Sequence, residues 1–454
     1  MGFSTLVLAA GAGTRMKSHK PKVAHEILGK PLLRWVVDAA REAGTDEVFV
    51  VLGEGRETVA PLVPDATLVY QGEQLGTGHA VLMAQSALEA AGVETLVVVS
   101  GDTPLLQPPT IASLVAAHQA DGAAVSLLSM HVADPTGYGR VLRDAAGAVC
   151  RIVEQKDATG AELTVDEVNS GLYCFRTARL FALLAGLRND NHQHEYYLTD
   201  VVALALAAGE GVMARLAADT AELAGINNRV QLAEATATAQ RRINTQHMLN
   251  GVTILDPATA WIGPDVVLAS DVEILPLTSL TGKTSIGWGS VIGPMSRVNN
   301  SRIAESCVVD DSVLVDVILE DRVSVGPRAY LRPGTVMREG SHAGTHVEIK
   351  KSEIGPHSKV PHLSYIGDAV LGSEVNIGAG SITCNFDGRE KHATIIGSRS
   401  FVGSDTMFVA PVTMGEDAAT GAGSVITDAI PDGTLAIARA EQKNGRSWTR
   451  KGKE

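Results

Sequence analysis

Apolar and polar positions follow two different patterns along the chain. In the first half, continuous apolar runs at 4–10, 47–52 and 95–100 alternate with amphipathic stretches at 31–43 and 78–91. Apolar runs of this length, separated by helical patterns, are typical of strands that are buried on both faces of a sheet. We therefore expect an α/β domain with a mixed, mostly parallel sheet, whose ligands bind beyond the carboxyl ends of the strands.

From about Trp261 the pattern becomes a six-residue repeat. Each unit begins with an aliphatic residue, continues with Gly or another small residue, and often has Ser, Thr, Ala or Val at its fifth position. This repeat predicts a left-handed parallel β-helix whose aliphatic residues stack inside a narrow prism. The polar stretch 383–392, which contains Asp387-Gly388, is expected to leave the coils as a loop. The aliphatic residues followed by Gly are Ile262, Ile286, Ile292, Val325, Ile354, Ile366, Leu371, Ile377, Ile396, Val402 and Met414.

A single helix is predicted between these two patterns. Residues 228–250 contain no Gly or Pro, and Asn250-Gly251 is a typical helix end. We therefore expect domains at 1–227 and 251–454, joined by a linker helix at 228–250. The tail from Arg439 has six Lys or Arg against two Glu. It either meets phosphate groups or is a solvated end, and beyond Arg439 the solvated end is favoured.

Composition excludes several classes of protein. With 45% hydrophobic and 20% charged residues the chain is not disordered, and a net charge of −13 opposes binding to nucleic acid or to an anionic membrane. No apolar run approaches the ~20 residues of a membrane helix, and the start of the chain does not resemble a signal peptide. The four cysteines form no C-x-x-C pair, so we expect no disulfide framework or zinc site and a cytoplasmic location.

A glycine-rich turn directly follows the first apolar run. Residues 8–22 read LAAGAGTRMKSHKPK. Met16 stands where a dinucleotide fingerprint and a P-loop both need glycine, so neither motif fits. The turn can still direct backbone N–H groups at phosphates, and four basic residues follow it, so a phosphate site is favoured over a solvated basic stretch. The basic residues are Arg15, Lys17, Lys20 and Lys22.

Two further segments carry candidate ligand chemistry. Residues 71–78 (QGEQLGTG) form a second glycine-bearing loop before a helix, although a simple helix start explains that pattern equally well. Asp102 follows Ser100 and Gly101 at the end of the third apolar run. A carboxylate at this edge of the sheet can hold Mg²⁺, and an ordinary Asp-Thr-Pro turn is the alternative.

Motifs in this order and spacing resemble those of a known family. The segments LAAGAGTRM, QLGTGHA, TGYGR, IVEQKDA, VNSG and GINN are similar to motifs of the sugar-1-phosphate nucleotidyltransferases. With the repeats behind them, residues 4–440 resemble the bacterial bifunctional N-acetylglucosamine-1-phosphate uridyltransferases and glucosamine-1-phosphate N-acetyltransferases. The resemblance implies a Rossmann-like nucleotidyltransferase domain and a β-helix acetyltransferase domain. It also implies acetyl-CoA and UTP as co-substrates and Mg²⁺ as cofactor.

In the first domain, the resemblance assigns residues to UTP, Mg²⁺ and the sugar phosphate. Arg15 and Lys22 would bind the UTP phosphates and act in catalysis, while Asp102 and Asn227 would hold Mg²⁺. In-line attack of the sugar phosphate on the α-phosphorus needs positioning and charge neutralisation rather than a protein nucleophile. The residues implied to bind UTP or UDP-N-acetylglucosamine are Leu8, Ala9, Ala10, Gly11, Lys22, Gln71, Gly76, Thr77, Ser100, Gly101, Asp102, Gly139, Glu154, Asn169 and Asn227.

In the second domain, polar residues interrupt the repeats where an aliphatic prism has no need of them. Because the pKa of His lies near 7, a His can take the proton of an attacking amine, and the resemblance implies this role for His362. A backbone N–H near Ala379 would stabilise the oxyanion. The residues implied to hold glucosamine-1-phosphate are Arg332, Lys350, Tyr365, Asn376 and Lys391. Those implied to contact acetyl-CoA are Ala379, Asn385, Phe386, Ser404, Ala422 and Arg439.

Two departures from the family pattern and two alternatives remain. Relatives often carry Tyr in place of Ser100 and of Phe386, which puts a nucleotide contact and one acetyl-CoA hydrogen bond in doubt. The spacing of His342 and His346 suits zinc on a helix but not on β-coils. In the second alternative, the β-helix serves only in oligomerisation or regulation. The family also implies a homotrimer with shared acetyltransferase sites, small-molecule substrates, no nucleic-acid partner and no membrane insertion.

Overall fold

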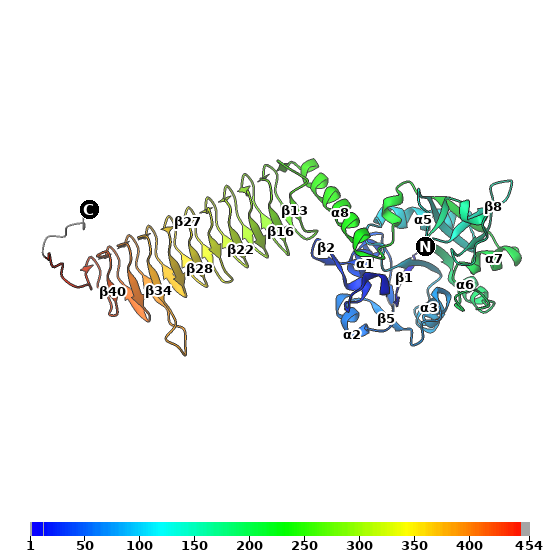
Figure 1. Ribbon diagram of the computed structural model, residues 1–454, viewed down its shortest axis with the longest axis horizontal. Coiled ribbons are helices and arrows are strands. Elements are labelled where there is room, and N and C mark those ends of the chain that lie inside the picture. The colour runs from blue at the N-terminus through cyan, green and yellow to red at the C-terminus, as the bar shows by residue number, and fades with distance from the viewer. Residues whose placement is uncertain (1, 12, 446–454) are drawn as a thin grey trace, which may run out of the picture. The chain divides into compact units, whose positions relative to one another are not determined.

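A computed structural model describes residues 2–11 and 13–445 of the protein (Figure 1). These residues form two compact units, one ending at Ala239 and the other beginning at Gln240. The division lies inside helix α8 (Arg229–Leu249), which covers most of the predicted linker. The functional boundaries at 227 and 251 stay a prediction. Residues 446–454 of the basic tail lie outside the described residues.

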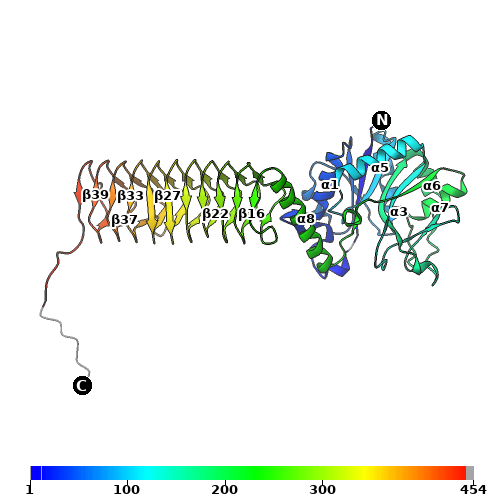
Figure 2. The same cartoon turned by 90° about the horizontal axis from the view of Figure 1, so that it is seen from above.

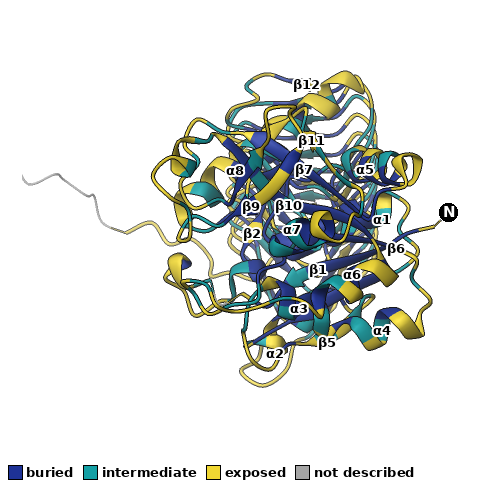
Figure 3. Ribbon diagram, turned by 90° about the vertical axis from the view of Figure 1, so that its right-hand side faces the viewer, coloured by how far each residue is buried: buried dark blue, intermediate teal, exposed yellow. Residues whose placement is uncertain are grey.

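The first unit contains the predicted mixed sheet. Its longest path runs β11-β7-β10-β6-β1-β4-β5, and neighbours along it are parallel except where β10 pairs with β6 and β7. The three apolar runs form its central strands, which are buried in Figure 3, so the prediction of an α/β domain is confirmed. The strands are β1 (Ser4–Ala9), β4 (Val48–Leu52), β5 (Thr67–Tyr70), β6 (Thr95–Ser100), β7 (Val125–His131), β10 (Glu167–Arg176) and β11 (Val212–Leu216), with β8 (Arg140–Arg143) and β9 (Val149–Val153) off this path.

Helices cover both faces of this sheet and form two separate cores. Apolar residues of α1 and α5 pack on one face, and those of α3, α4, α6 and α7 pack on the other. The amphipathic stretch predicted at 78–91 forms two short helices, which meet at Ala84, where ψ is −5°. Ala80, Ala84 and Leu88 all belong to the core on this face of the sheet. The helices are α1 (Leu32–Glu42), α3 (Thr77–Met83), α4 (Gln85–Ala90), α5 (Pro108–Asp121), α6 (Thr177–Leu184) and α7 (Asp200–Ala207).

The second unit is the predicted left-handed β-helix (Figure 2). Its short strands form three parallel sheets, which begin at β12 (Thr253–Ile254), β13 (Trp261–Ile262) and β14 (Val267–Leu268). All eleven aliphatic repeat residues named above are at most 3% exposed, which confirms the inward stacking.

The fifth position of the repeat also has a structural role. Ser358, for example, is fully buried, donates to the carbonyl of Gly372 at 2.7 Å and accepts from the backbone N–H of Val375 at 2.9 Å. A small hydroxyl therefore links one coil to the next where a larger side chain would not fit.

The polar stretch 383–392 does protrude from the coils, but it begins later than predicted. Thr383 still belongs to β34 (Ile382–Cys384), which pairs with β37 (Met407–Val409). The reason is the buried Thr383 hydroxyl, which accepts from the backbone N–H of Gly367 at 2.7 Å. The loop therefore begins at Asn385, and a bridge between Phe386 and Lys391 closes it.

Because the prism is narrow, we expect a cavity within it to be costly. Phe408 is 1% exposed, whereas Phe401 on a neighbouring sheet is 55% exposed. Phe408→Ala should lower the free energy of unfolding by about 3–5 kcal/mol, since Phe→Ala in a core removes buried area and leaves a void. Urea unfolding followed by circular dichroism measures this, with Phe401→Ala as the control. Equal losses in the two variants would contradict the inward stacking.

Candidate active sites of the two units

A cavity of about 440 Å³ lies in the first unit, at the carboxyl ends of its parallel strands. The glycine-rich turn after β1 lines one side of it, and loops after β5 and β6 line others. Sequence prediction found most of its lining. The predicted residues along the cavity are Leu8, Ala9, Ala10, Gly11, Lys22, Gln71, Gly76, Thr77, Ser100, Asp102, Glu154 and Asn169.

The predicted phosphate and metal residues meet at one point. The ammonium group of Lys22 forms an ion pair with the carboxylate of Asp102 and donates to Asn227 Oδ1 at 3.2 Å. Arg15 also donates to Asn227 Oδ1, at 2.8 Å. Two side-chain oxygens, from Asp102 and Asn227, therefore converge on one positive charge.

Ser100 takes part in this cluster. Its hydroxyl donates to Asp102 Oδ1 at 2.6 Å, and Asp102 is 8% exposed. The hydrogen bond fixes one carboxylate oxygen of Asp102 and leaves the other for Lys22. Gly101 packs behind the cavity, where an added Cβ would lie 3.2 Å from the carbonyl oxygen of Leu8.

The residues predicted for the sugar form a second group, of which Glu154 and Asn169 line the cavity. The backbone N–H of Asn169 donates to the carbonyl of Gly139 at 2.8 Å. A Cβ added to Gly139 would lie 3.4 Å from the carboxylate oxygens of Glu154, so glycine leaves room there. Glu154 accepts from the hydroxyl of Thr199 at 3.1 Å. Burial raises the pKa of Glu154, and the nearby carboxylates of Asp200, Asp157 and Glu195 raise it further.

The residues predicted for the base form a third group. Gln71 is 3% exposed, and its amide nitrogen donates to the carbonyl of Gly76 at 3.2 Å and to His79 Nδ1 at 3.0 Å. Gln74 donates to the carbonyl of Ala10 at 2.6 Å, which ties this loop to the glycine-rich turn. The only sequence signal for Gln74 is its place inside the second glycine-bearing loop.

Sequence reasoning missed eight of the described residues along the cavity, four of which have polar side chains. These four are Tyr173, Thr199, Gln74 and Glu195. Tyr173 is a buried residue of β10, and it is indistinguishable in sequence from a core aromatic residue. Its hydroxyl donates to Asn169 Oδ1 at 2.9 Å, a contact that only the fold reveals.

In the second unit, several predicted acetyl-CoA contacts lie along one corner of successive coils. The backbone N–H of Gly380 donates to the carbonyl of His362 at 3.3 Å, and that of Asp405 donates to Ala379 at 2.8 Å. In the next coil, Gly423 donates to Ser404 at 2.8 Å. We call these residues the corner column. It consists of His362, Ala379, Ser404 and Ala422.

The carboxylate of Asp368 organises a second cluster on these coils. Its Oδ2 accepts from Lys350 Nζ at 3.3 Å and from the amide of Asn385 at 2.5 Å, and Asn385 also donates to the hydroxyl of Tyr365 at 3.5 Å. The glycine at 367 makes room, since a Cβ there would lie 2.5 Å from the Tyr365 hydroxyl. Sequence reasoning missed Asp368, because nothing in the repeat marks it.

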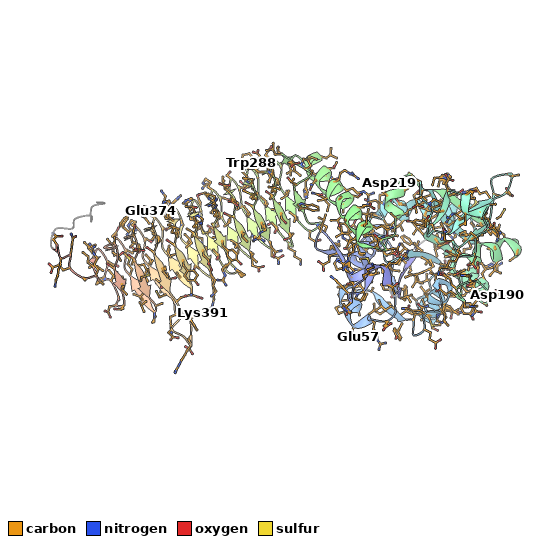
Figure 4. The ribbon with its side chains drawn as sticks, in the orientation of Figure 1. Glu57, Asp190, Asp219, Trp288, Glu374 and Lys391 are labelled. Carbon is orange, nitrogen blue, oxygen red and sulfur yellow. The ribbon has the colours of Figure 1, made fainter. Side chains whose placement is uncertain are left out.

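Lys391 and Arg332 complete this Asp368 cluster. Lys391 lies on the loop (Figure 4), and the ammonium group of Lys350 lowers its pKa. Arg332 donates to Glu348 at 2.7 Å, which raises the pKa of Arg332. These cations and the hydroxyl of Tyr365 form a surface suited to a phosphate group.

The residues predicted to bind one substrate do not all lie together in this chain. Asn376 stands on another sheet, in β33 (Asn376–Ile377), where it pairs with Lys359. Phe386 is 58% exposed on the loop, whereas Arg439 continues the corner column, with its Cδ 3.9 Å from a Cβ added to Gly423. The predicted acetyl-CoA contacts therefore divide between the corner column and the Asp368 cluster.

Comparison with known proteins finds relatives that match this chain over both units. The family model of the MobA-like NTP transferase domain matches residues 5–196. A protein of Heliobacterium modesticaldum named Bifunctional protein GlmU is 49% identical over 441 residues, which cover 97% of this chain and 96% of that protein. Proteins of the same name from Caldanaerobacter subterraneus and Streptomyces avermitilis are both 48% identical, cover 98% of this chain, and are themselves covered over 97% and 93% of their lengths.

The buried carboxyl of Glu154 should make stability depend on pH. Its pKa is raised in the folded protein, so between the unfolded and folded pKa values the folded state binds more protons, and stability falls as pH rises through this window. Glu154→Gln should weaken this fall, as measured by unfolding midpoints from about pH 4 to about pH 8. Glu42→Gln, at an exposed glutamate, is the control. A wild-type pH dependence in Glu154→Gln would contradict the prediction.

Proposed function

The chain belongs to the family of the bifunctional GlmU proteins, and we propose that the two sites described above carry out its two reactions. As a member of this family it is a transferase with two activities, which supply UDP-N-acetylglucosamine for cell-wall precursors. It acetylates glucosamine-1-phosphate with acetyl-CoA, and it transfers the uridylyl group of UTP to N-acetylglucosamine-1-phosphate with release of pyrophosphate. The observation that carries the assignment of sites is that each unit has its own cationic cluster.

In the uridylyl site, the protein supplies positioning and positive charge. The glycine-rich turn and Lys22 would bind the phosphates of UTP, and Gln71 would accept a hydrogen bond from uracil. Glu154 and Asn169 would hold the sugar, so that its phosphate oxygen attacks the α-phosphorus in line as pyrophosphate leaves. Arg15 and Lys22 would stabilise the charge that develops on the phosphates.

We propose Mg²⁺ as the cofactor of this site. The oxygens of Asp102 and Asn227 already converge on the cation of Lys22, and carboxylate and amide oxygens are suitable Mg²⁺ ligands. Bound there, Mg²⁺ would neutralise charge on the UTP phosphates. Lys22 would bind a phosphate oxygen of UTP beside it.

In the acetyl-transfer site, His362 would take a proton from the amine of glucosamine-1-phosphate. The amine then attacks the thioester carbonyl, the backbone N–H near Ala379 stabilises the oxyanion, and the thiolate of coenzyme A leaves with a proton. Acetyl-CoA would lie along the corner column, and the phosphate of the sugar would meet Arg332 and the lysines of the Asp368 cluster. A β-helix that served only as a scaffold has no use for this cluster.

We further propose a cytoplasmic homotrimer. Outward-facing apolar side chains occupy four of five successive positions on the third sheet of the β-helix, with Glu353 between Val336 and Val370. An exposed apolar row of this kind favours association. The division of the predicted acetyl-CoA contacts within one chain also fits sites completed by a second subunit. No described helix is both long and apolar enough to cross a membrane, and all four cysteines are free, as suits a reducing compartment. The apolar row is Ile318, Val336, Val370 and Ile395.

An omission assay tests the two activities and their order. Purified protein receives glucosamine-1-phosphate, acetyl-CoA, UTP and Mg²⁺, while free thiol and pyrophosphate are followed separately. We expect thiol release without UTP, and pyrophosphate release only when the acetylated sugar phosphate is supplied or being made. Pyrophosphate release from supplied N-acetylglucosamine-1-phosphate, without any thiol release, would support the scaffold alternative.

Single substitutions should separate the two activities. His362→Ala should reduce acetyl transfer by about 10²- to 10⁴-fold, the usual effect of losing a general base, and leave uridylyl transfer near normal. Asp102→Ala or chelation of Mg²⁺ should do the reverse. His357→Ala, at another corner of the β-helix, is the control for His362→Ala. Equal loss of both activities in His362→Ala would contradict separate sites.

The mass in solution tests the trimer. Light scattering should give three times the chain mass of 47.5 kDa. Ile395→Asp, in the apolar row, should lower both this mass and acetyl transfer, because burial of a charge opposes association. Val308→Asp, at an exposed apolar position on another sheet of the β-helix, is the control. A monomeric wild-type protein with full acetyl transfer would overturn the proposal.

A further inference from the structure

Among the described residues, three primary amides line the cavity of the first unit, and two of them, Gln71 and Asn169, belong to the predicted binding residues. Gln71 belongs to the base group and Asn169 to the sugar group. A primary amide offers a donor and an acceptor, and a rotation by 180° exchanges them. Such a group discriminates between ligands only when its orientation is fixed, so the contacts behind each amide decide what it can bind.

The contacts of Asn169 fix its oxygen toward the protein. Asn169 Oδ1 accepts from the backbone N–H of Gly171 at 3.2 Å and from the hydroxyl of Tyr173 at 2.9 Å. An N–H group can only donate, so the atom that faces Gly171 must be the oxygen. A register shift in β10 between Asn169 and Tyr173 accompanies this contact. The amide nitrogen of Asn169 is left as a donor for the ligand.

Tyr173 is built into the sheet to serve this contact. Its side chain is 2% exposed, and its ring stacks on Phe175 with centroids 5.5 Å apart. Burial raises the pKa of Tyr173, so its hydroxyl stays a neutral donor. The ring itself could be held by packing alone, which leaves the hydroxyl with a separate function.

The contacts of Gln71 fix the opposite orientation. Its amide nitrogen donates to the carbonyl of Gly76 at 3.2 Å and to His79 Nδ1 at 3.0 Å. A carbonyl can only accept, so the atom that faces Gly76 must be nitrogen, and His79 must then accept through Nδ1 with its proton on Nε2. The oxygen of Gln71 is left as an acceptor for the ligand.

We propose that Tyr173 and His79 are positioning residues that hold these two amides in opposite orientations. Asn169 then donates to an acceptor oxygen of the sugar phosphate, and Gln71 accepts from the N3–H of uracil. Cytosine has an unprotonated N3, which would meet the oxygen of Gln71 acceptor to acceptor, so the contact of His79 makes the site select UTP against CTP. This inference rests on the proposed assignment of the cavity to UTP and the sugar phosphate.

Two variants test the inference, and each is the matched control of the other. Tyr173→Phe should raise the KM for N-acetylglucosamine-1-phosphate about 3- to 10-fold, the range expected for one lost hydrogen bond, with little change in the KM for UTP. His79→Leu should raise the KM for UTP by a similar factor and lower the UTP-to-CTP preference in kcat/KM. His79→Asn, whose side-chain oxygen can replace Nδ1, should restore much of that preference. Acetyl transfer, measured on the same samples, should stay unchanged in all three variants.

Double variants separate positioning from general loosening of the fold. If Tyr173 acts through Asn169, Tyr173→Phe should add nothing to the KM increase of Asn169→Ala. Equal increases in both KM values, or full additivity with Asn169→Ala, would overturn the inference for Tyr173. An unchanged UTP-to-CTP preference in His79→Leu would overturn it for His79. If Asn169→Ala and Gln71→Ala themselves left both KM values unchanged, the proposed assignment of the cavity would fail instead.

Discussion

Parallel pairing of strands is the constraint on which both units depend. In the first unit it brings the carboxyl ends of β1, β4, β5 and β6 to one edge of the sheet, so segments far apart in sequence line one cavity. In the second unit it stacks equivalent positions of successive coils, so His362 and Ala422 lie on the same corner. Functional side chains are therefore placed by strand register in both cases, although the two folds have nothing else in common.

Basic side chains gather in both candidate sites although the chain as a whole is acidic. The protein carries a net charge of −13, yet Arg15 and Lys22 converge in one cavity, and Lys350 and Lys391 converge on the β-helix. In each place a carboxylate holds the cation in the absence of ligand, Asp102 in the first unit and Asp368 in the second. Such ion pairs hold the cations in place at the two proposed phosphate sites.

Sequence reasoning succeeded where a feature repeats or belongs to a compact motif. The apolar runs predicted the central strands, the six-residue period predicted the β-helix, and the motif residues predicted most of the cavity lining. It failed where a role depends on contacts across the fold. Tyr173 reads as a core residue until its hydroxyl is seen on Asn169, and Asp368 has no signal in its own repeat. The loop was predicted to begin too early, at Thr383, because the buried hydroxyl of this residue keeps it in β34 although its side chain is polar.

The corner column also fixes the distances between its residues along the axis of the β-helix. Neighbouring parallel strands are about 4.8 Å apart, so each coil advances the column by that fixed step. A β-helix can gain or lose a whole coil during evolution without losing its fold, because every coil offers the same surface to the next. Between His362 and Ala422 such a change would alter the distance available to an extended ligand by one step. Insertions should therefore accumulate in the coils before Arg332, because none of the residues assigned to either substrate lies there.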